Sequence, residues 1–232
     1  RDTAIVIDDR AGEACARAAE ELAFAVESKG GPKLRLIRSS EVESDPHALR
    51  KAIVLGETGR DALVKKLCER ERVRLPRSRF GTTSHVVDVT SDRVIVGGQT
   101  AVDVYYGVQT LKQLIRTLGD ASLEIPAVGI RDYPRFGFRG VHLLASGDAF
   151  AYISRLIERV LAPLKINHIV LQTDKVAWKS HPEVIDPENF MPREDVRKLI
   201  DVARRHQISV TPLVQSPGHL EWAFRDRKNL EF

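Results

Sequence analysis

Four side chains able to take part in chemistry gather near the carboxyl-terminal end of the chain. They follow the apolar run Ile208–Val214, which ends at Pro217 and Gly218 and is typical of a buried strand with a sharp turn. The four are Gln215, His219, Glu221 and Trp222. Because ligands and catalytic groups collect at the carboxyl ends of strands in α/β folds, this stretch predicts one wall of a functional site. A buried strand followed by an ordinary loop is the alternative.

A carboxylate and an aromatic ring, Asp174 and Trp178, follow the preceding apolar run His168–Gln172. Such a pair suits a sugar, whose C–H face packs on a ring while its hydroxyls form hydrogen bonds. Gln215 fits the same chemistry, since its amide both donates and accepts. The alternatives are that Trp178 anchors the loop and that Gln215 caps the turn. His142, in the predicted strand Phe138–Leu144, either points into a site or is a satisfied core histidine.

The sequence gives little support for a metal site, for cysteine chemistry or for a phosphate-binding loop. The four histidines at positions 47, 85, 168 and 206 are scattered and form no metal-ligating set. Cys15 and Cys68 lack disulfide or C-x-x-C spacing and lie in apolar, helix-like patterns. No G-x-G-x-x-G or Walker pattern occurs. We therefore expect neither a metal nor a cofactor.

The 232 residues, 43% hydrophobic and 29% charged, indicate a soluble globular protein of one large or two small domains. No apolar run approaches the roughly 18–20 residues of a membrane helix. The net charge of +4 is too small to demand a polyanionic partner, and acids interrupt the basic run from Lys65 to Arg79. We expect neither nucleic acid nor membrane as a partner. The chain starts at Arg1 and not at Met, so the sequence is compatible with a leader that was removed and with a secreted or periplasmic location.

Strands and helices are mixed over residues 1–122, which predicts a small α+β sandwich domain. The expected strands are Thr3–Ile7, Leu34–Ile37, Ala52–Leu55, His85–Val89 and Arg93–Val96. The expected helices are Glu13–Ser28, 60–70 and one from Thr100, in a capping-box-like pattern with Asp103, to about Leu118. Residues 123–134, punctuated by proline and glycine, are expected to form a connector.

Residues 135–232 show the strand–helix–strand rhythm of a parallel sheet or barrel. The expected helices are Ala149–Leu164 and Arg193–His206, between the three strands already named. A closed (β/α)8 barrel needs roughly 200–250 residues, whereas only about a hundred follow Tyr133. Three parallel strands alone would leave a sheet edge and apolar faces open. This part is therefore predicted to be the first three β/α units of an incomplete (β/α)8 TIM barrel.

Several segments resemble glycoside hydrolase family 20, the β-N-acetylhexosaminidases. Pro134–Leu143 resembles the first barrel strand of that family, Leu164–Ile169 the approach to the second, and Val210–His219 the third-strand motif ending in Pro-Gly-His. Residues 1–120 resemble the α+β domain that commonly precedes the barrel. The resemblance implies a carbohydrate substrate containing N-acetylglucosamine or N-acetylgalactosamine.

The resemblance also implies a substrate-assisted, retaining hydrolysis of terminal β-linked N-acetylhexosamine. In the family, the sugar's own acetamido oxygen attacks the anomeric carbon. An Asp orients that amide, and an adjacent Glu at the end of the fourth strand protonates the departing oxygen. Glu194-Asp195 is reversed in order and opens a helix, so the catalytic pair is expected beyond Phe232 and this portion alone should be inactive.

Substrate-binding or supporting roles are thus expected for His219, Gln215, Asp174, Trp178 and His142. By the resemblance, His219 lines the sugar pocket; the alternative is a loop histidine satisfied by backbone. Asp174 falls within one residue of a family carboxylate. Leu213 and Gln215 replace the usual Glu and Asp, a pattern closer to the hexosaminidase D type.

Three departures leave rival interpretations open. Leu144 and Gly147 stand where many members have an Asp and an Arg that hold sugar hydroxyls, and Gln172 stands where a His is common. An inactive carbohydrate-binding protein on the same fold is the first alternative. A glycosidase of another family with the same two-domain plan is the second, and a non-enzymatic domain whose basic run meets an acidic partner is the third.

Overall fold

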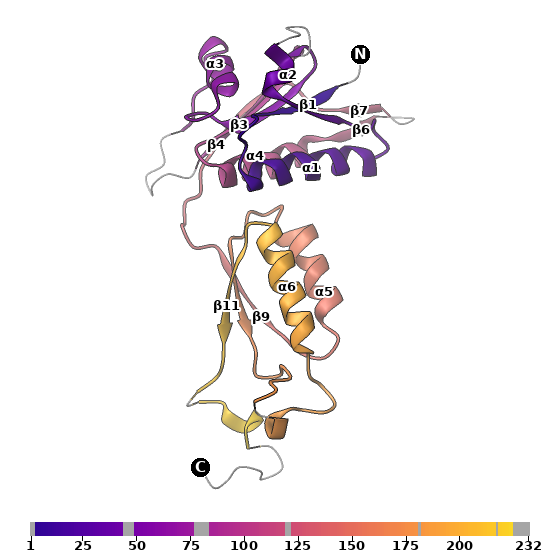
Figure 1. The fold of residues 1–232 in the computed structure, drawn as a ribbon, viewed down its shortest axis with the longest axis vertical. Coiled ribbons are helices and arrows are strands. Elements are labelled where there is room, and N and C mark those ends of the chain that lie inside the picture. Colours follow the sequence, from indigo (N-terminus) through magenta and orange to yellow (C-terminus); the bar gives the residue numbers. More distant parts are fainter. Residues whose placement is uncertain are drawn as a thin grey trace. The chain divides into compact units, whose positions relative to one another are not determined.

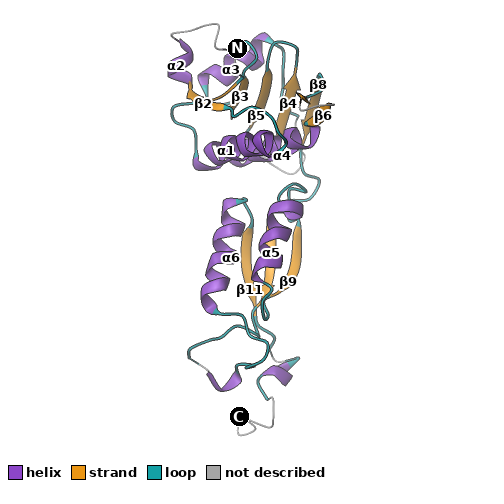
Figure 2. Cartoon of the chain, turned by 90° about the vertical axis from the view of Figure 1, so that its right-hand side faces the viewer, coloured by secondary structure: helices purple, strands orange, loops and turns teal. Residues whose placement is uncertain are grey.

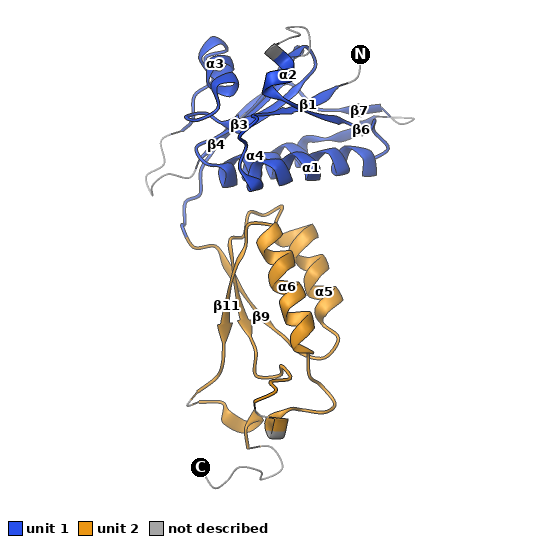
Figure 3. Cartoon of the chain, viewed as in Figure 1, with its two compact units in different colours: residues 1–137 blue, residues 138–232 orange. Residues whose placement is uncertain are grey.

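The computed structural model describes residues 3–43, 49–76, 84–118, 122–180, 182–216 and 218–224. The chain divides into two compact units, 1–137 and 138–232, coloured separately in Figure 3. This boundary lies close to the expected start of the second part at residue 135. Each unit is described by itself below.

A mixed six-stranded sheet forms the centre of the first unit, in the order β2-β1-β3-β5-β4-β8. Its strands are β1 (Ala4–Ile7), β2 (Arg35–Arg38), β3 (Ile53–Glu57), β4 (His85–Val89), β5 (Val94–Gly98) and β8 (Val128–Asp132). Strand β1 runs parallel to β2 and β3, and β3 runs parallel to β5. Strand β4 is antiparallel to β5 and β8, so β4 and β5 form a hairpin.

Helices cover both faces of this sheet (Figure 1). One face carries α1 (Glu13–Ser28) and α4 (Ala101–Leu114); the other carries α2 (Ser39–Glu43) and α3 (Ala62–Arg70). Because side chains alternate along a strand, Ile5 and Ile7 pack in the core of the first face and Val6 in that of the second. The layered α+β arrangement agrees with the expectation for this part of the chain.

Both cysteines are core residues, as their apolar surroundings in the sequence predict. Cys15 packs in the α1–α4 core and Cys68 in the core under α3. Burial raises the pKa of the Cys15 thiol to about 12 and that of Cys68 to about 11. Both thiols therefore stay protonated and unreactive at neutral pH.

Helix α4 begins with the expected capping box and ends earlier than expected. The Asp103 backbone N–H donates to Thr100 Oγ1 at 3.3 Å, and the Thr100 N–H donates to Asp103 Oδ2 at 3.0 Å. The helix was expected to reach about Leu118, but it stops at Leu114. Ile115 is extended and β6 (Arg116–Leu118) pairs with β7 (Ser122–Glu124). Since Ile115 is buried in this extended conformation, its apolar spacing did not locate the helix end.

The connector expected over residues 123–134 is wrong in its central part. Strand β8 lies there and pairs with β4 along its whole length, at the edge of the sheet. Its residues alternate between half-buried and exposed, so apolar content identifies it poorly. Pairing with β4, and not burial, makes these residues a strand.

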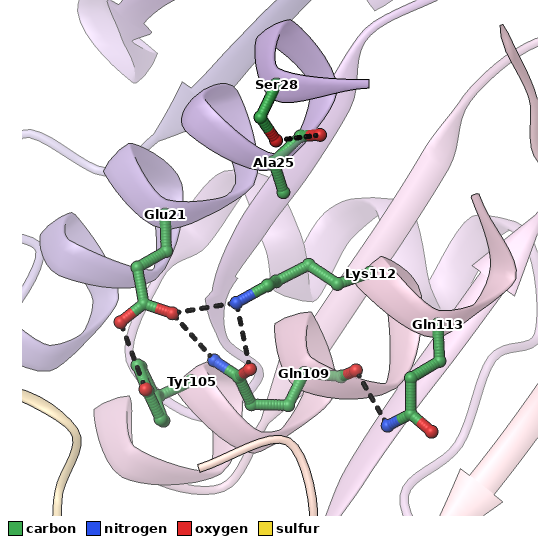
Figure 4. Close-up of polar contacts among 7 residues, drawn as sticks. All are labelled: Glu21, Ala25, Ser28, Tyr105, Gln109, Lys112 and Gln113. Carbon is green, nitrogen blue, oxygen red and sulfur yellow. Dashed lines mark hydrogen bonds and ion pairs between the residues drawn. The ribbon is translucent and has the colours of Figure 1, made fainter. Parts of the chain in front are cut away.

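A hydrogen-bonded network links α1 to α4 (Figure 4). Glu21 on α1 accepts from the Tyr105 hydroxyl at 3.0 Å, from Gln109 Nε2 at 3.0 Å and from Lys112 Nζ at 2.9 Å. Lys112 Nζ also donates to Gln109 Oε1 at 3.0 Å. Tyr105 and Gln109 are fully buried, and burial raises the pKa of the Tyr105 hydroxyl far above its ordinary value. One carboxylate therefore satisfies three donors between the two helices.

The second unit is a parallel sheet of three strands in the order β11-β10-β9. The strands are β9 (Gly140–Leu144), β10 (His168–Gln172) and β11 (Ser209–Leu213). Helix α5 (Phe150–Leu156), continued by a π-helical turn over Ile157–Leu161, joins β9 to β10, and α6 (Arg193–Arg205) joins β10 to β11. The expected rhythm of strand, helix and strand is confirmed.

Helices α5 and α6 lie on one face of this small sheet (Figure 2). Ile169 and Leu171 of β10 point to that face and pack in its core. The alternate residues His142, Val170 and Thr211 are aligned across the three strands on the opposite face. Among the described residues, no helix packs on that opposite face. None of the described helices combines the length and apolar character needed to cross a bilayer.

We predict that Glu21→Ala lowers the free energy of unfolding by about 3 kcal/mol, because two buried donors and an ammonium lose their shared acceptor. Urea unfolding followed by circular dichroism measures the difference. Glu20→Ala is the matched control, since Glu20 is the exposed neighbour on the same helix, and its effect should stay below about 0.5 kcal/mol. Equal effects of the two substitutions would contradict the stabilising role of the network.

Candidate functional site

The carboxyl ends of β9, β10 and β11 lie side by side at one end of the small sheet. Leu144, Gln172 and Leu213, the last residues of the three strands, lie in register. Backbone pairing continues one residue further, because Ala145 N donates to Gln172 O at 2.9 Å and Thr173 N donates to Leu213 O at 2.8 Å. The segments that carry the predicted site residues therefore leave the sheet side by side.

Asp174 connects two of these strand ends. Its side chain is buried, with 8% exposure. Its Oδ2 accepts from Gln172 Nε2 at 2.5 Å, and its Oδ1 accepts from the Gln215 backbone N–H at 3.1 Å. Hydrogen bonds to an ionised carboxylate are the stronger kind. The structure thus brings Asp174 and Gln215 together and fixes the backbone from which the Gln215 side chain projects.

Gln172 belongs to the same polar cluster, although in the sequence it stands out only as a departure from the family pattern. It ends β10 and shares the edge with Asp174, two positions later. Side chains two positions apart on an extended chain point to the same side. The spacing of Gln172 and Asp174 could therefore have predicted that the two side chains are neighbours.

Trp178 is held within its own loop. Its indole Nε1 donates to Thr173 O at 3.2 Å, and its ring packs against the core of the second unit. The loop is tied further through buried Met191, whose N–H donates to Lys175 O at 2.8 Å and whose carbonyl accepts from Ala177 N at 3.1 Å. This geometry matches the loop-anchoring alternative for Trp178.

The two predicted site histidines lie apart from the Asp174 cluster. His219 is exposed, has a left-handed backbone with φ of 56°, and forms no hydrogen bond within the described part of the chain. His142 is exposed on the face of the sheet opposite α5 and α6, and is not a core residue of this unit. Pro217, which precedes the turn, lies outside the described residues.

The other two polar groups of the opening stretch lie in the short 3₁₀ helix Leu220–Trp222. Glu221 is exposed there. Trp222 Nε1 is buried and has no hydrogen-bond partner among residues 218–224 or the other described segments.

The backbone explains what Gly147 contributes. Its φ is +49°, in the left-handed region, and a Cβ added there would lie 2.9 Å from Asn189 Oδ1. An arginine at this position would strain the backbone and displace Asn189. Leu144, three residues earlier, is 40% exposed at the strand end. The backbone at this position therefore favours the glycine that replaces the arginine of many family members.

Acidic residues elsewhere in this unit form surface ion pairs. At the start of α6, Glu194 pairs with Arg197 at 3.6 Å and Asp195 with Lys198 at 3.0 Å. In each pair the partners are three residues apart on one helix, and ion pairs of this kind near the surface contribute little to stability. In the described segments, no group of three histidine, cysteine or carboxylate side chains is placed to hold a metal ion.

Sequence relatives, solved structures and a family profile all indicate the same family. Relatives include a β-N-acetylhexosaminidase of Cellulomonas fimi, 26% identical over 159 residues, which covers 62% of this chain and 32% of the relative. Another is a lacto-N-biosidase of Bifidobacterium bifidum, 25% identical over 146 residues, which covers 62% of this chain and 13% of the relative.

The fold agrees with solved structures of this family. A GH20 β-N-acetylhexosaminidase from Streptomyces coelicolor A3(2) matches 96% of this chain with a TM-score of 0.70 at 20% identity, and the match covers 44% of that protein. A β-N-acetylhexosaminidase from Bacteroides fragilis matches 97% with a TM-score of 0.67 at 23% identity, and the match covers 43% of it. The chain thus spans less than half the length of these relatives.

The sequence profile described as "Glycosyl hydrolase family 20, domain 2" matches residues 1–133, more than half of the 232 residues. This match falls on the six-stranded unit, whereas the polar cluster at the strand ends belongs to the second unit. On this evidence, the chain belongs to glycosyl hydrolase family 20.

Proposed function

We propose that the protein containing this chain is a β-N-acetylhexosaminidase that removes terminal β-linked N-acetylhexosamine. Family membership and the hexosaminidase names of its relatives support the reaction. The single observation that carries the site is the buried Asp174 carboxylate, which joins the ends of β10 and β11 through Gln172 and Gln215. Neutral amides held beside a fixed carboxylate suit a neutral, polyhydroxylated substrate.

In this proposal the second unit is the start of a (β/α)8 barrel. Within the described residues, helices cover one face of its parallel sheet and not the other, whereas parallel sheets are normally buried on both faces. Exposed apolar side chains at the strand ends, Leu144 and Val214, would be covered when further strands close the barrel. The solved relatives, of which this chain spans less than half, supply enough length for those strands.

The proposed mechanism is substrate-assisted and retaining. The acetamido oxygen of the substrate attacks the anomeric carbon, an Asp orients the amide, and the adjacent Glu protonates the leaving oxygen. We expect this Asp-Glu pair beyond Phe232. Within the chain, Asp174 positions Gln215, and the Gln215 amide and His219 bind sugar hydroxyls. Trp178 holds the loop, and His142 faces the barrel interior.

A catalytically inactive carbohydrate-binding protein is the second candidate. The specific observation in its favour is the loop after β9, where Leu144 and Gly147 replace two sugar-holding groups. The left-handed backbone at Gly147 and the nearness of Asn189 show that this loop is adapted to glycine. Both candidates bind the same sugars and differ only in turnover.

The full-length protein is expected to hydrolyse an aryl N-acetyl-β-glucosaminide, because the family's catalytic pair would complete the site. Release of the aryl alcohol measures the rate, and calorimetry with N-acetylglucosamine measures binding. Sugar binding without turnover would replace the enzyme proposal with the binding-protein candidate, and the absence of both would reject the two together.

Asp174→Ala is expected to lower kcat/KM of the full-length protein about tenfold, mainly by raising KM. Each of the lost charge-assisted hydrogen bonds contributes about 1.5–3 kcal/mol of free energy. Part of this loss is expressed as greater disorder of the Gln215 backbone. Asp174→Asn should have a smaller effect, because it retains one acceptor oxygen.

Asp201→Asn on the exposed surface of α6 is the control, since Asp201 only pairs with Arg204 at the surface. It should leave both kinetic constants unchanged. A merely structural role for Asp174 would lower the amount of active enzyme, and so kcat, at constant KM. That pattern would refute a positioning role.

A further inference from the structure

A second polar site lies in the first unit, outside everything assigned above. A cavity of about 750 Å³ opens beyond the carboxyl ends of β1, β2 and β3. Its polar lining is formed by Asp8, Asp9, Arg10, Ser39, Arg60 and Lys66. The matched family profile covers this unit, so the cavity belongs to that domain. The proposed hydrolysis assigns no role to the cavity.

The strand order explains why a cavity forms at this place. Strand β1 lies between β2 and β3, with all three parallel. The connection from β1 leads through α1 to β2 on one side, whereas the connection from β3 leads through α3 to β4 on the other side of the sheet. Figures 1 and 2 show α1 on one face of the sheet and α2 and α3 on the opposite face. Where neighbouring connections diverge in this way, open α/β sheets leave a crevice at the strand ends that binds ligands.

Three cationic side chains from separate segments line the cavity. Arg10 follows β1, Arg60 follows β3, and Lys66 lies on α3. Arg60 Nη1 is 3.8 Å from Glu57 Oε1, a long ion pair in which the arginine side chain is exposed. Arg10 and Lys66 form no ion pair with any residue of the described segments. Positive side chains gathered from three segments, two of them without an acid partner, are available to an anionic ligand.

The cavity also holds a fixed hydrogen-bond acceptor. Asp9 accepts from Ser40 Oγ at 2.7 Å, from Ser39 Oγ at 2.8 Å and from Ser40 N at 3.0 Å. The hydroxyl hydrogen bonds from Ser40 and Ser39 keep the pKa of Asp9 below its ordinary value, so it stays ionised at neutral pH. Asp8 is fixed by the Arg10 backbone N–H at 2.8 Å. Both carboxylates remain acceptors for hydroxyl groups.

Apolar side chains complete the lining, and they belong to Val42, Leu49, Ala62 and Leu63. No aromatic ring is among the lining residues, so base stacking of a nucleotide has no platform. The combination of cations, hydroxyl acceptors and aliphatic surface corresponds to a sugar that carries an acidic group. We propose that this cavity binds an acidic saccharide, with Arg10, Arg60 and Lys66 holding its carboxylate or sulfate and Asp8 and Asp9 accepting from its hydroxyls.

Calorimetric titration of the full-length protein at low ionic strength tests this site. The probes are D-glucuronic acid, D-glucose as the neutral analogue, and acetate as the carboxylate alone. N-Acetylglucosamine is present throughout, so that the proposed hexosamine site is occupied. Glucuronic acid should bind saturably and at least about tenfold more tightly than either partial probe, because only it meets both halves of the lining.

Lys66→Met and Arg10→Met should each weaken glucuronic acid binding about tenfold. Lys65→Met is the matched control, because Lys65 is the next exposed lysine on α3 and does not line the cavity. It should bind glucuronic acid like the unsubstituted protein. Unchanged melting temperatures would verify that the three variants are folded.

Three results would overturn the proposal: no saturable binding of glucuronic acid, equal affinity for acetate, or equal losses in the Lys65 and Lys66 variants. Equal affinity for acetate would reveal an anion site without sugar recognition. None of these readouts depends on glycosidase activity, so a failure of this proposal is distinguishable from a failure of the proposed hydrolysis.

Discussion

The two hydrogen bonds accepted by buried Asp174 are the constraint on which the candidate site depends. They join the end of β10 to the backbone after β11, two segments that are 41 residues apart in sequence. Without an acceptor at this point, the Gln172 amide and the Gln215 N–H would be left unpaired at the strand ends, at a cost in free energy. The carboxylate therefore orders the strand ends from which the side chains proposed to bind sugar project.

Both units place polar groups beyond the carboxyl ends of parallel strands. In the second unit these groups are Gln172, Asp174 and Gln215; in the first they surround the cavity beyond β1, β2 and β3. The physical reason is common to both, because the pleated part of a parallel sheet is filled with apolar side chains and leaves polar residues to the loops that follow. The two sites differ in charge: the first combines three cations with two carboxylates, whereas the second pairs one carboxylate with amide donors.

The sequence predicted regular elements better than it predicted the site. Helix Glu13–Ser28 and strand His168–Gln172 have the expected bounds, because an apolar periodicity and a clear breaker marked each. Strand β8 was missed, since edge pairing and not burial defines it. The hydrogen bond between Gln172 and Asp174 was also not predicted, although both residues stood out in the sequence. The bond from the Gln215 N–H to Asp174 depends on the pairing of β10 with β11, which neighbours in the sequence do not determine.

The structure of the full-length protein with bound N-acetylglucosamine would test the central claim most directly. Our account predicts the sugar beyond the carboxyl ends of β9, β10 and β11, with the Gln215 amide and His219 within hydrogen-bond distance of its hydroxyls and Asp174 keeping its bonds to Gln172 and Gln215. A sugar bound elsewhere, or bound there with the Asp174 hydrogen bonds broken, would contradict it.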